Sequence, residues 1–416
     1  MGGILRSGYV LGLALAAPFC AAAPVAGFEE RQPYVPPPLY CGEEFGAPLG
    51  PEQCVLISVW STAAAGWDSQ SGALAGLRSS ARVGVVIDDA GVTAVVGGHV
   101  DLGHPLFSVM PAPPVSGMLT AAFVQLGHES WIRAGLVDGT FDSLLSVRPS
   151  QKISDRADGF TAGVLDVMNS TGLGGLAVQA HADFGHGWSA DLGLEDIAET
   201  GIGNYFIFPP DPLLGRPIAQ LVYDDGESFI LMRGEASMRP DLTFRESEAT
   251  IYGQTARNRM EAYSVLRLNR NDNGVFGRTA AGVRIEALEN IFVGVGGGAE
   301  LDGSAIDYVL SADIGDDELG PSVGIMTRAY AGPSQSITEV GLSWSYAWEN
   351  VKATAALRRW ESTYFPSPLW ETSARLSWNI SDHASLTVAG AVNTDGGAKA
   401  TLRLESAFDG EVPEME

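Results

Sequence analysis

Apolar and polar residues alternate along most of the sequence. In the segment Ala398–Phe408, the small or apolar members alternate with Lys399, Thr401, Arg403 and Glu405. A period of two is typical of a β-strand with one apolar and one polar face, and the length matches the ~9–11 residues of a membrane-crossing strand. Because an open strand edge leaves backbone groups unsatisfied in hydrocarbon, such a sheet must close, with the last strand beside the first. An outer strand of a soluble β-sandwich explains this segment equally well.

Tryptophans at strand ends favour the membrane interpretation. Leu342–Leu357 reads as a hairpin with a turn at Glu349-Asn350, and its first arm has Trp344 and Trp348 on the apolar face. Trp348, and Trp378 in the next strand, each lie just before a predicted tight turn, where the aromatic girdle of a membrane barrel lies. We assign to this girdle Trp344, Trp348, Trp378 and Phe408. Buried core tryptophans are the alternative, but the opposite face of each strand is polar.

Strand-like segments recur about every ten residues, and their connections differ in length. We predict tight turns at Phe184–Gly187, Glu289-Asn290, Glu349-Asn350 and Ser381-Asp382, and longer loops at 199–216, 267–273, 313–321 and 359–368. Short turns at one end and long loops at the other are typical of outer-membrane barrels, whereas a sandwich usually has ~7–9 strands in ~100 residues. The sequence therefore predicts an all-β, transmembrane antiparallel β-barrel of about 16 strands.

Composition narrows the choice of partners. The 416 residues carry a net charge of −25 and 18% charged residues, so nucleic acid is not an expected partner and cationic or neutral small solutes are more natural ones. After the N-terminus no run of ~18 apolar residues occurs, as a helical membrane span would require.

The N-terminal segment is predicted to be an export signal. Residues 1–27 combine a basic start, an apolar stretch and small residues at Val25–Gly27 before the cleavage point, so the barrel unit is assigned to 28–408. An N-terminal anchor helix and lipidation at Cys20 are the alternatives. Removal of the signal leaves two cysteines, Cys41 in the Pro-rich segment 28–53 and Cys54 just after it. We predict that they form a disulfide, because exported proteins with an even number of cysteines commonly pair them.

The sequence resembles the alphaproteobacterial porins. The resemblance is carried by Cys41 and Cys54 before the first strand and by Ala121–Gly127, Ala134–Asp142, Phe184–Ala190 and Leu194–Asp196, and it extends loosely from Tyr34 to Phe408. It implies a 16-stranded outer-membrane barrel, usually a trimer, that passes small hydrophilic solutes and has no catalytic residues. Members usually end on the aromatic residue of the last strand, whereas here the acidic tail 409–416 follows Phe408.

The same resemblance implies that the third outer loop folds into the barrel, and the connection Asp138–Phe160 lies at that position. Acidic groups on such a loop, facing basic groups on the wall, would set a transverse field across the pore. The candidates are Asp142, Asp155 and Asp158 on the loop and Arg78, Arg82 and Arg133 on the wall. The alternatives are ordinary solvated lumen arginines and exposed loop aspartates.

Enzyme chemistry finds little support in the sequence. The six histidines are scattered, and neither an HExxH zinc motif nor a GxSxG nucleophile motif occurs. Asn271–Gly274 reads as a plain turn rather than a calcium loop. We expect no cofactor, no metal and no catalytic site.

The sequence therefore predicts passive diffusion of small hydrophilic solutes and ions, with a preference for cations, across the outer membrane of a Gram-negative bacterium. The expected partners are outer-membrane lipid and lipopolysaccharide, further copies in a homotrimer, and the barrel-assembly machinery during biogenesis. Two other functions stay open: a substrate-specific outer-membrane channel, and a surface or adhesion barrel with a plugged lumen.

Overall fold

The structure of the chain is a computed structural model. It describes residues 47–50, 53–69, 72–87, 91–103, 115–139, 142–146, 175–197, 214–257, 259–271, 274–315, 320–332, 336–348, 350–363, 368–381 and 384–410. The predicted signal segment 1–27, Cys41, Asp155, Asp158 and the tail beyond Gly410 lie outside the described residues, as do the side chains of Cys54 and Phe408.

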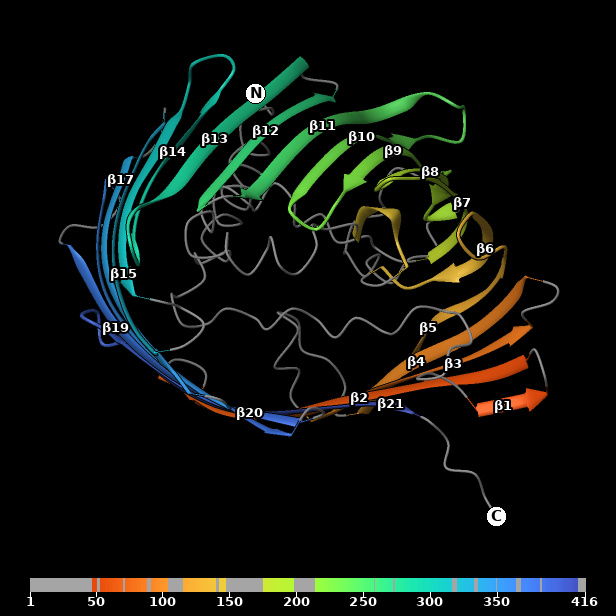
Figure 1. The fold of residues 1–416 in the computed structure, drawn as a ribbon, viewed down its shortest axis with the longest axis horizontal. Coiled ribbons are helices and arrows are strands. Elements are labelled where there is room, and N and C mark those ends of the chain that lie inside the picture. Colours follow the sequence, from red (N-terminus) through yellow and green to blue (C-terminus); the bar gives the residue numbers. More distant parts are fainter. Residues whose placement is uncertain are drawn as a thin grey trace, which may run out of the picture.

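All strands of the described part belong to one antiparallel sheet of 21 strands (Figure 1). They are β1 (Ala47–Gly50), β2 (Gln53–Asp68), β3 (Gly72–Ile87), β4 (Val92–Gly103), β5 (Val115–Leu126), β6 (Trp131–Val137), β7 (Gly175–Gly185), β8 (Trp188–Glu195), β9 (Arg216–Asp224), β10 (Ser228–Met238), β11 (Phe244–Arg257), β12 (Met260–Asn271), β13 (Gly274–Leu288), β14 (Ile291–Glu300), β15 (Ile306–Gly315), β16 (Gly320–Ala331), β17 (Ser336–Ala347), β18 (Val351–Ser362), β19 (Leu369–Ser381), β20 (Ala384–Asn393) and β21 (Ala398–Gly410). One 3₁₀ turn, η1 (Leu144–Ser146), lies between β6 and β7.

The sheet closes on itself. β21 pairs with β20 on one side and with β2 on the other, and in the second pair Ala63 lies opposite Leu404. β2 also pairs with β3, so the strands from β2 to β21 form a ring, while the short β1 adds to β2. The predicted contact between first and last strands is confirmed. The predicted count is wrong, because the ring in the described residues has 20 strands instead of about 16.

Part of this difference lies between β11 and β13, where both connections have only two residues. The predicted loop 267–273 is mostly strand, since β12 continues to Asn271 and β13 begins at Gly274. Residues 258–259 join β11 to β12 equally tightly, and Arg259 there has a positive φ of 66°. The connection between β11 and β12 contains neither Gly nor Pro, the residues that usually mark a break, so the sequence gives little sign of it.

Connections differ between the two ends of the ring. At the end where β2 begins and β21 finishes, every connection has two to four residues, and all four predicted tight turns lie there. We call this the short-turn end. The longest connections, 104–114, 138–174 and 196–215, all lie at the opposite end, which we call the long-connection end. The predicted long loop 313–321 is wrong, because β15 continues to Gly315 and β16 already begins at Gly320.

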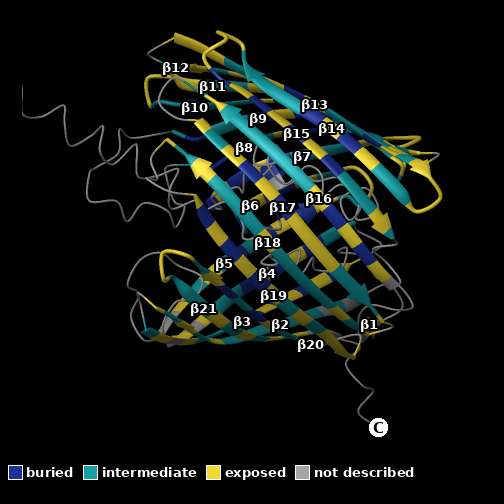
Figure 2. Cartoon of the chain, turned by 90° about the vertical axis from the view of Figure 1, so that its left-hand side faces the viewer, coloured by how far each residue is buried: buried dark blue, intermediate teal, exposed yellow. Residues whose placement is uncertain are grey.

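The outer face of the ring is apolar and the inner face is largely polar. Exposed leucine, valine, isoleucine and tryptophan alternate along each strand with buried polar side chains (Figure 2). Leu342, half exposed, points outward from β17, whereas Glu339 on the same strand is buried on the inner face. The buried polar set includes Arg82, Gln125, Arg133, Gln179, Asp191, Gln220, Arg233, Gln254, Arg284, Asp307, Glu339 and Glu371. This is the arrangement expected of a barrel in lipid with a polar lumen.

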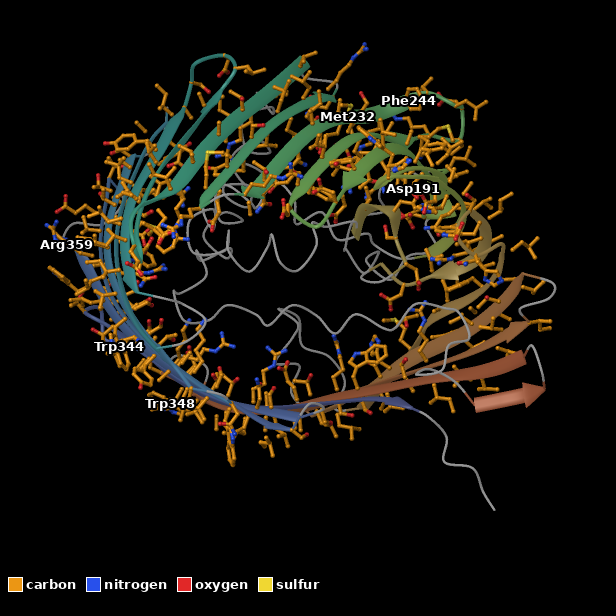
Figure 3. All side chains as sticks on the ribbon, in the orientation of Figure 1. Asp191, Met232, Phe244, Trp344, Trp348 and Arg359 are labelled. Atoms are coloured by element: carbon orange, nitrogen blue, oxygen red, sulfur yellow. The ribbon has the colours of Figure 1, made fainter. Side chains whose placement is uncertain are left out.

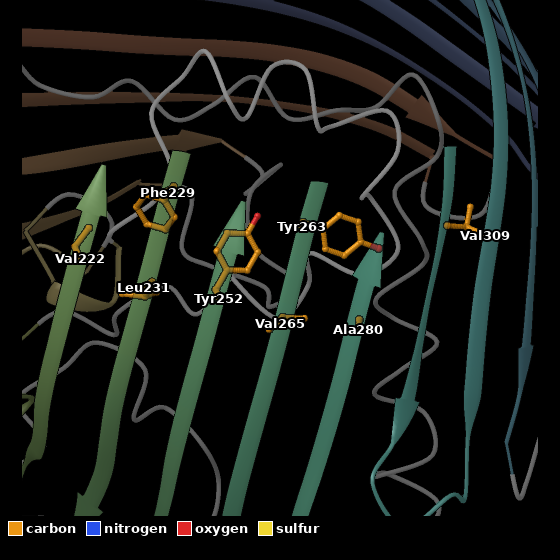
Figure 4. Close-up of a cluster of buried hydrophobic side chains, with 8 residues drawn as sticks. All are labelled: Val222, Phe229, Leu231, Tyr252, Tyr263, Val265, Ala280 and Val309. Atoms are coloured by element: carbon orange, nitrogen blue, oxygen red, sulfur yellow. The ribbon is translucent and has the colours of Figure 1, made fainter. Parts of the chain in front are cut away.

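One part of the inner face is apolar. A cluster on β9 to β13 and β15 brings together Val222, Phe229, Leu231, Tyr252, Tyr263, Val265, Ala280 and Val309, each at most 7% exposed (Figure 4). Phe229 and Leu231 share their face of β10 with Arg233. Met232, which lies between Leu231 and Arg233, is exposed on the outer face. A second, smaller cluster on β4 to β7 comprises Val95, Ala121, Phe123, Val137 and Ala177, so the lumen wall combines polar stretches with apolar ones.

Candidate functional site

Two arginines of the wall lie close together on the lumen side. Arg82 in β3 and Arg133 in β6 alternate with exposed outward residues, and their side chains are only 7% and 10% exposed. Phe123 of β5 lies between them, with its ring centroid 5.5 Å from the guanidinium of Arg82 and 4.4 Å from that of Arg133. These distances allow cation–π attraction, which is stronger when the pair is desolvated.

Gly135 makes room for this stack. A Cβ at this position would lie 2.3 Å from the carbonyl oxygen of Ala122 and 2.6 Å from the Cα of Phe123. Its φ of 138° is also rarely adopted by residues with a side chain. Substitution of Gly135 would therefore displace Phe123 from beneath the two arginines.

Asp142 joins both arginines to the start of the connection 138–174. Its Oδ1 accepts from Arg82 Nη2 and lies 3.4 Å from Arg133 Nη1, while the backbone N–H of Asp138 donates to Oδ2 at 3.2 Å. The Asp142 side chain is 4% exposed. Arg133 also donates to Gln125 Oε1, from Nη2 at 2.7 Å and from Nε at 3.2 Å. The connection therefore begins fastened to the inner wall.

Glu195, the last residue of β8, accepts hydrogen bonds from the two residues that follow Asp142. One carboxylate oxygen accepts from the backbone N–H of Leu144 at 2.6 Å, and the other accepts from the Ser143 hydroxyl at 2.5 Å. Gln179 of β7 donates to both Glu195 Oε1, at 2.7 Å, and the Asp142 carbonyl, at 2.9 Å. Leu144 and Leu145 pack on Ile218 of β9. This segment, residues 142–146 bound to β3, β6, β7, β8 and β9, is called the anchored segment below.

A chain of polar contacts continues from it around the wall. Asp191 of β8 points into the lumen (Figure 3) and lies 2.7 Å from His181 Nδ1. Its second oxygen accepts from Gln220, whose own oxygen accepts from Arg233 Nε at 2.9 Å. Arg233 Nη2 reaches the Leu144 carbonyl at 3.4 Å, which closes the circuit back to the anchored segment.

The remaining wall carries alternating acids and bases. Arginines of the inner face pair with carboxylates on nearby strands: Arg267 with Glu248 at 2.5 Å, Arg284 with Glu261 at 3.4 Å and with Asp313 at 3.3 Å, Arg328 with Asp307 at 2.6 Å, and Arg358 with Glu339 at 3.4 Å. The charges of these arginines are thus balanced at the wall itself.

The structure brings together three of the six predicted lumen residues, which are Asp142, Arg82 and Arg133. They were expected to face one another across the pore, but the described side chains are in direct contact. Arg78 lies four residues before Arg82 on the same face of β3, roughly 13 Å away along the strand, so it is not part of this cluster. Asp155 and Asp158 lie outside the described residues.

Sequence reasoning missed Glu195, Gln179, Asp191 and His181. A signal for Glu195 exists, because it ends a strand on the polar face just before a long connection. Its partners, which are Gln179 on β7 and Ser143 and Leu144 in the connection, depend on strand register and on the path of the connection, and nothing in the local pattern encodes them.

The predicted girdle tryptophans lie on the outer face. Trp344, Trp348 and Trp378 are each at least 43% exposed, and Figure 3 shows Trp344 and Trp348 on the outside of the ring. Trp348 donates its backbone N–H to Val351, and Val351 lies opposite Trp378, so these two tryptophans flank the same end. Trp344 lies further inside β17.

Within the described residues, no helix has the length and apolar character to cross a membrane. No group of three or more His, Cys, Asp or Glu in the same residues is placed to hold a metal ion.

Solved structures share the fold at very low sequence identity. A structure of Pseudomonas aeruginosa OpdK with vanillate matches with a TM-score of 0.50 and 9% identity, over 85% of this chain and 98% of OpdK. A second structure, of the outer membrane protein OpdK from the same organism, gives the same values. No protein-family model matches the sequence, and none of the curated proteins matches it either. The likeness supports the barrel fold, and the resemblance to alphaproteobacterial porins stays a prediction.

Proposed function

We propose that the chain forms a water-filled channel through which small hydrophilic solutes and ions diffuse passively across a Gram-negative outer membrane. The observation that carries this proposal is the closed 20-stranded ring with an apolar outside and a mostly polar inside. Barrels of 16 to 18 strands already leave an aqueous channel. The structural neighbours, which are outer-membrane porins and not enzymes, support the same class of function.

The anchored segment narrows the lumen in this proposal. Its ion pairs and hydrogen bonds hold residues 142–146 against the inner wall between β3 and β9. The net charge of −25 favours cations over anions in the vestibules, and the locally balanced inner arginines do not oppose this preference. We further propose a homotrimer, exported by the predicted signal and stabilised by the predicted disulfide between Cys41 and Cys54.

Liposome swelling tests the proposed function. Folded protein is reconstituted into liposomes, which are then diluted into sugars of increasing size at equal osmolarity. We expect swelling rates that fall smoothly with solute size and rise linearly with concentration. Liposomes that contain folded, heat-modifiable protein but swell no faster than empty ones would refute the channel and favour a plugged barrel.

A substrate-specific channel is the second candidate. The observation in its favour is the dense cluster of charged and aromatic groups in the lumen, where the Arg133 guanidinium lies 4.4 Å from the ring centroids of both Phe123 and Trp131. Such a cluster could bind a solute while it passes. Saturable flux of one solute, with unrelated solutes of the same size excluded, would favour this candidate over general diffusion.

A further inference from the structure

The outer face of the ring has a depression over β8 to β13. Its volume is about 620 Å³, and its lining is almost entirely apolar. Its lining includes Leu192, Ala219, Gly234, Ala249, Leu268 and Arg270. Figure 3 shows Phe244, which also lines it, on the outside of the ring, so the depression faces the lipid and not the lumen.

Strand register explains its shape. Leu192, Ala219, Gly234, Ala249 and Leu268 are successive cross-strand partners, so small side chains lie in the middle of one row and leucines at both ends. A Cβ added at Gly234 would meet no atom within 4 Å, which shows that the space above it is open. Three adjacent strands make the floor roughly 10 Å across.

The row toward the short-turn end closes the depression. Met232 lies opposite Ile251, and both are large and exposed. In the other direction the next row pairs Ala236 with Ser247 and Ser247 with Arg270. The depression is therefore bounded by apolar side chains on one side and ends at an arginine on the other.

Arg270 differs from the arginines of the lumen. It is exposed, it is the second-last residue of β12, and within the described residues it makes no ion pair. Arg267, three residues earlier on the inner face, is paired with Glu248. Arg359, which also faces outward near the long-connection end (Figure 3), is paired with Glu361. Among the residues that the structure describes, Arg270 thus presents a positive charge without an ion-pair partner at the margin of an apolar depression.

We propose that this depression binds a phosphorylated acyl lipid of the outer leaflet, with an acyl chain on the floor around Gly234 and a phosphate on Arg270. The orientation comes from the proposed function, in which the long-connection end faces outward, since short turns of such barrels are periplasmic. At that end Arg270 lies at headgroup level, where a guanidinium forms strong charge-assisted hydrogen bonds with phosphate. An apolar partner surface alone would leave this charge without a counterpart.

Native mass spectrometry of the purified full chain, with bisphosphorylated lipid A added in detergent, tests the proposal. We expect one lipid per chain for the wild type, and roughly tenfold weaker binding for Arg270→Gln, the loss of one charge-assisted contact. Gly234→Leu, which fills the floor, should weaken binding to a similar extent. Arg359→Gln is the matched control and should bind like the wild type. Dephosphorylated lipid A should bind the wild type about as weakly as lipid A binds Arg270→Gln.

Two results would overturn the proposal. One is equal lipid binding by wild type, Arg270→Gln and Gly234→Leu, each folded as judged by heat-modifiable gel mobility. The other is loss of oligomers in Gly234→Leu without loss of lipid, which would assign the depression to a second copy of the chain. Because lipid binding is measured without any flux, its failure is distinguishable from failure of the channel.

Discussion

Replacing Asp142 with asparagine removes the carboxylate that joins the anchored segment to Arg82 and Arg133. The substitution keeps the shape of the side chain and one acceptor oxygen. It leaves two guanidinium groups, 7% and 10% exposed, without their shared anion. Gln179 still donates to the backbone carbonyl of residue 142, so the segment keeps part of its attachment.

Two magnitudes follow from this geometry. A permeating cation about 4–8 Å from the site meets one more unit of positive charge, worth about 0.5–1 kcal/mol in water, or roughly a two- to fivefold fall in cation permeability. Because an anion gains the same free energy, the cation-to-anion permeability ratio should fall roughly five- to thirtyfold. Removing one partner of a buried charge pair costs about 3–5 kcal/mol. Because Arg133 keeps Gln125 and Phe123, we expect at most the lower value, roughly a 150-fold shift toward a detached segment.

Planar-bilayer recordings check both effects. The reversal potential in a KCl gradient should move toward the equilibrium potential of chloride. Open-channel noise should increase as the segment detaches and reattaches. Asp302→Asn is the matched control: it removes the same charge from an exposed turn at the same end, where Asp302 accepts from the backbone N–H of Ser304. An unchanged reversal potential and unchanged noise in Asp142→Asn would refute the assigned role of this ion pair.

Three further predictions concern the anchor, the two faces of the wall and the short-turn end. Glu195→Ala leaves the Leu144 N–H and a Gln179 donor without their acceptor, at about 1–3 kcal/mol each, and should expose the connection to limited proteolysis at a rate at least tenfold above wild type. Leu342→Arg on the outer face should cost about 2–4 kcal/mol of unfolding free energy in lipid, whereas Ser343→Arg, its exposed inward neighbour, should cost far less; equal costs would contradict the assignment of faces. The pKa of Asp225 is lowered, chiefly by the hydrogen bond from the Glu227 backbone N–H. Its stabilisation of the β9–β10 turn is therefore present above the ordinary pKa of 3.8 and lost as the pH falls below it, so Asp225→Asn should flatten the acid limb of the stability curve.

The alternating pattern was sufficient to predict the architecture and the faces of the best strands. In β17 to β19 every second residue meets lipid, so Trp344, Leu357 and Trp378 are recognisable as outward from spacing alone. The same logic placed Arg82 and Arg133 on the lumen face, because a charge on the lipid face is costly. The predicted strand count was too low partly because the connection between β11 and β12 contains neither Gly nor Pro.

The details of the site depend on information that alternation does not contain. The pairing of Arg82 with Asp142 joins residues that are sixty positions apart, through the register of four strands and the path of a connection. The sequence predicted Arg82 and Arg133 on the wall and Asp142 on the connection, but it placed the two groups across the pore instead of in contact. Glu195 accepts hydrogen bonds from the Ser143 hydroxyl and from the backbone N–H of Leu144 in the anchored segment. This role becomes visible only when that segment is placed on the wall.

Single-channel conductance of the folded wild-type chain in a planar bilayer is the most direct test of a polar, open lumen inside an apolar ring. Protein that shifts in gel mobility on boiling is added to one side of the bilayer at constant voltage. The account predicts stepwise, nearly ohmic current increases as barrels insert. Insertion of the same folded protein, confirmed by recovery from the membrane, without any conductance steps would contradict it.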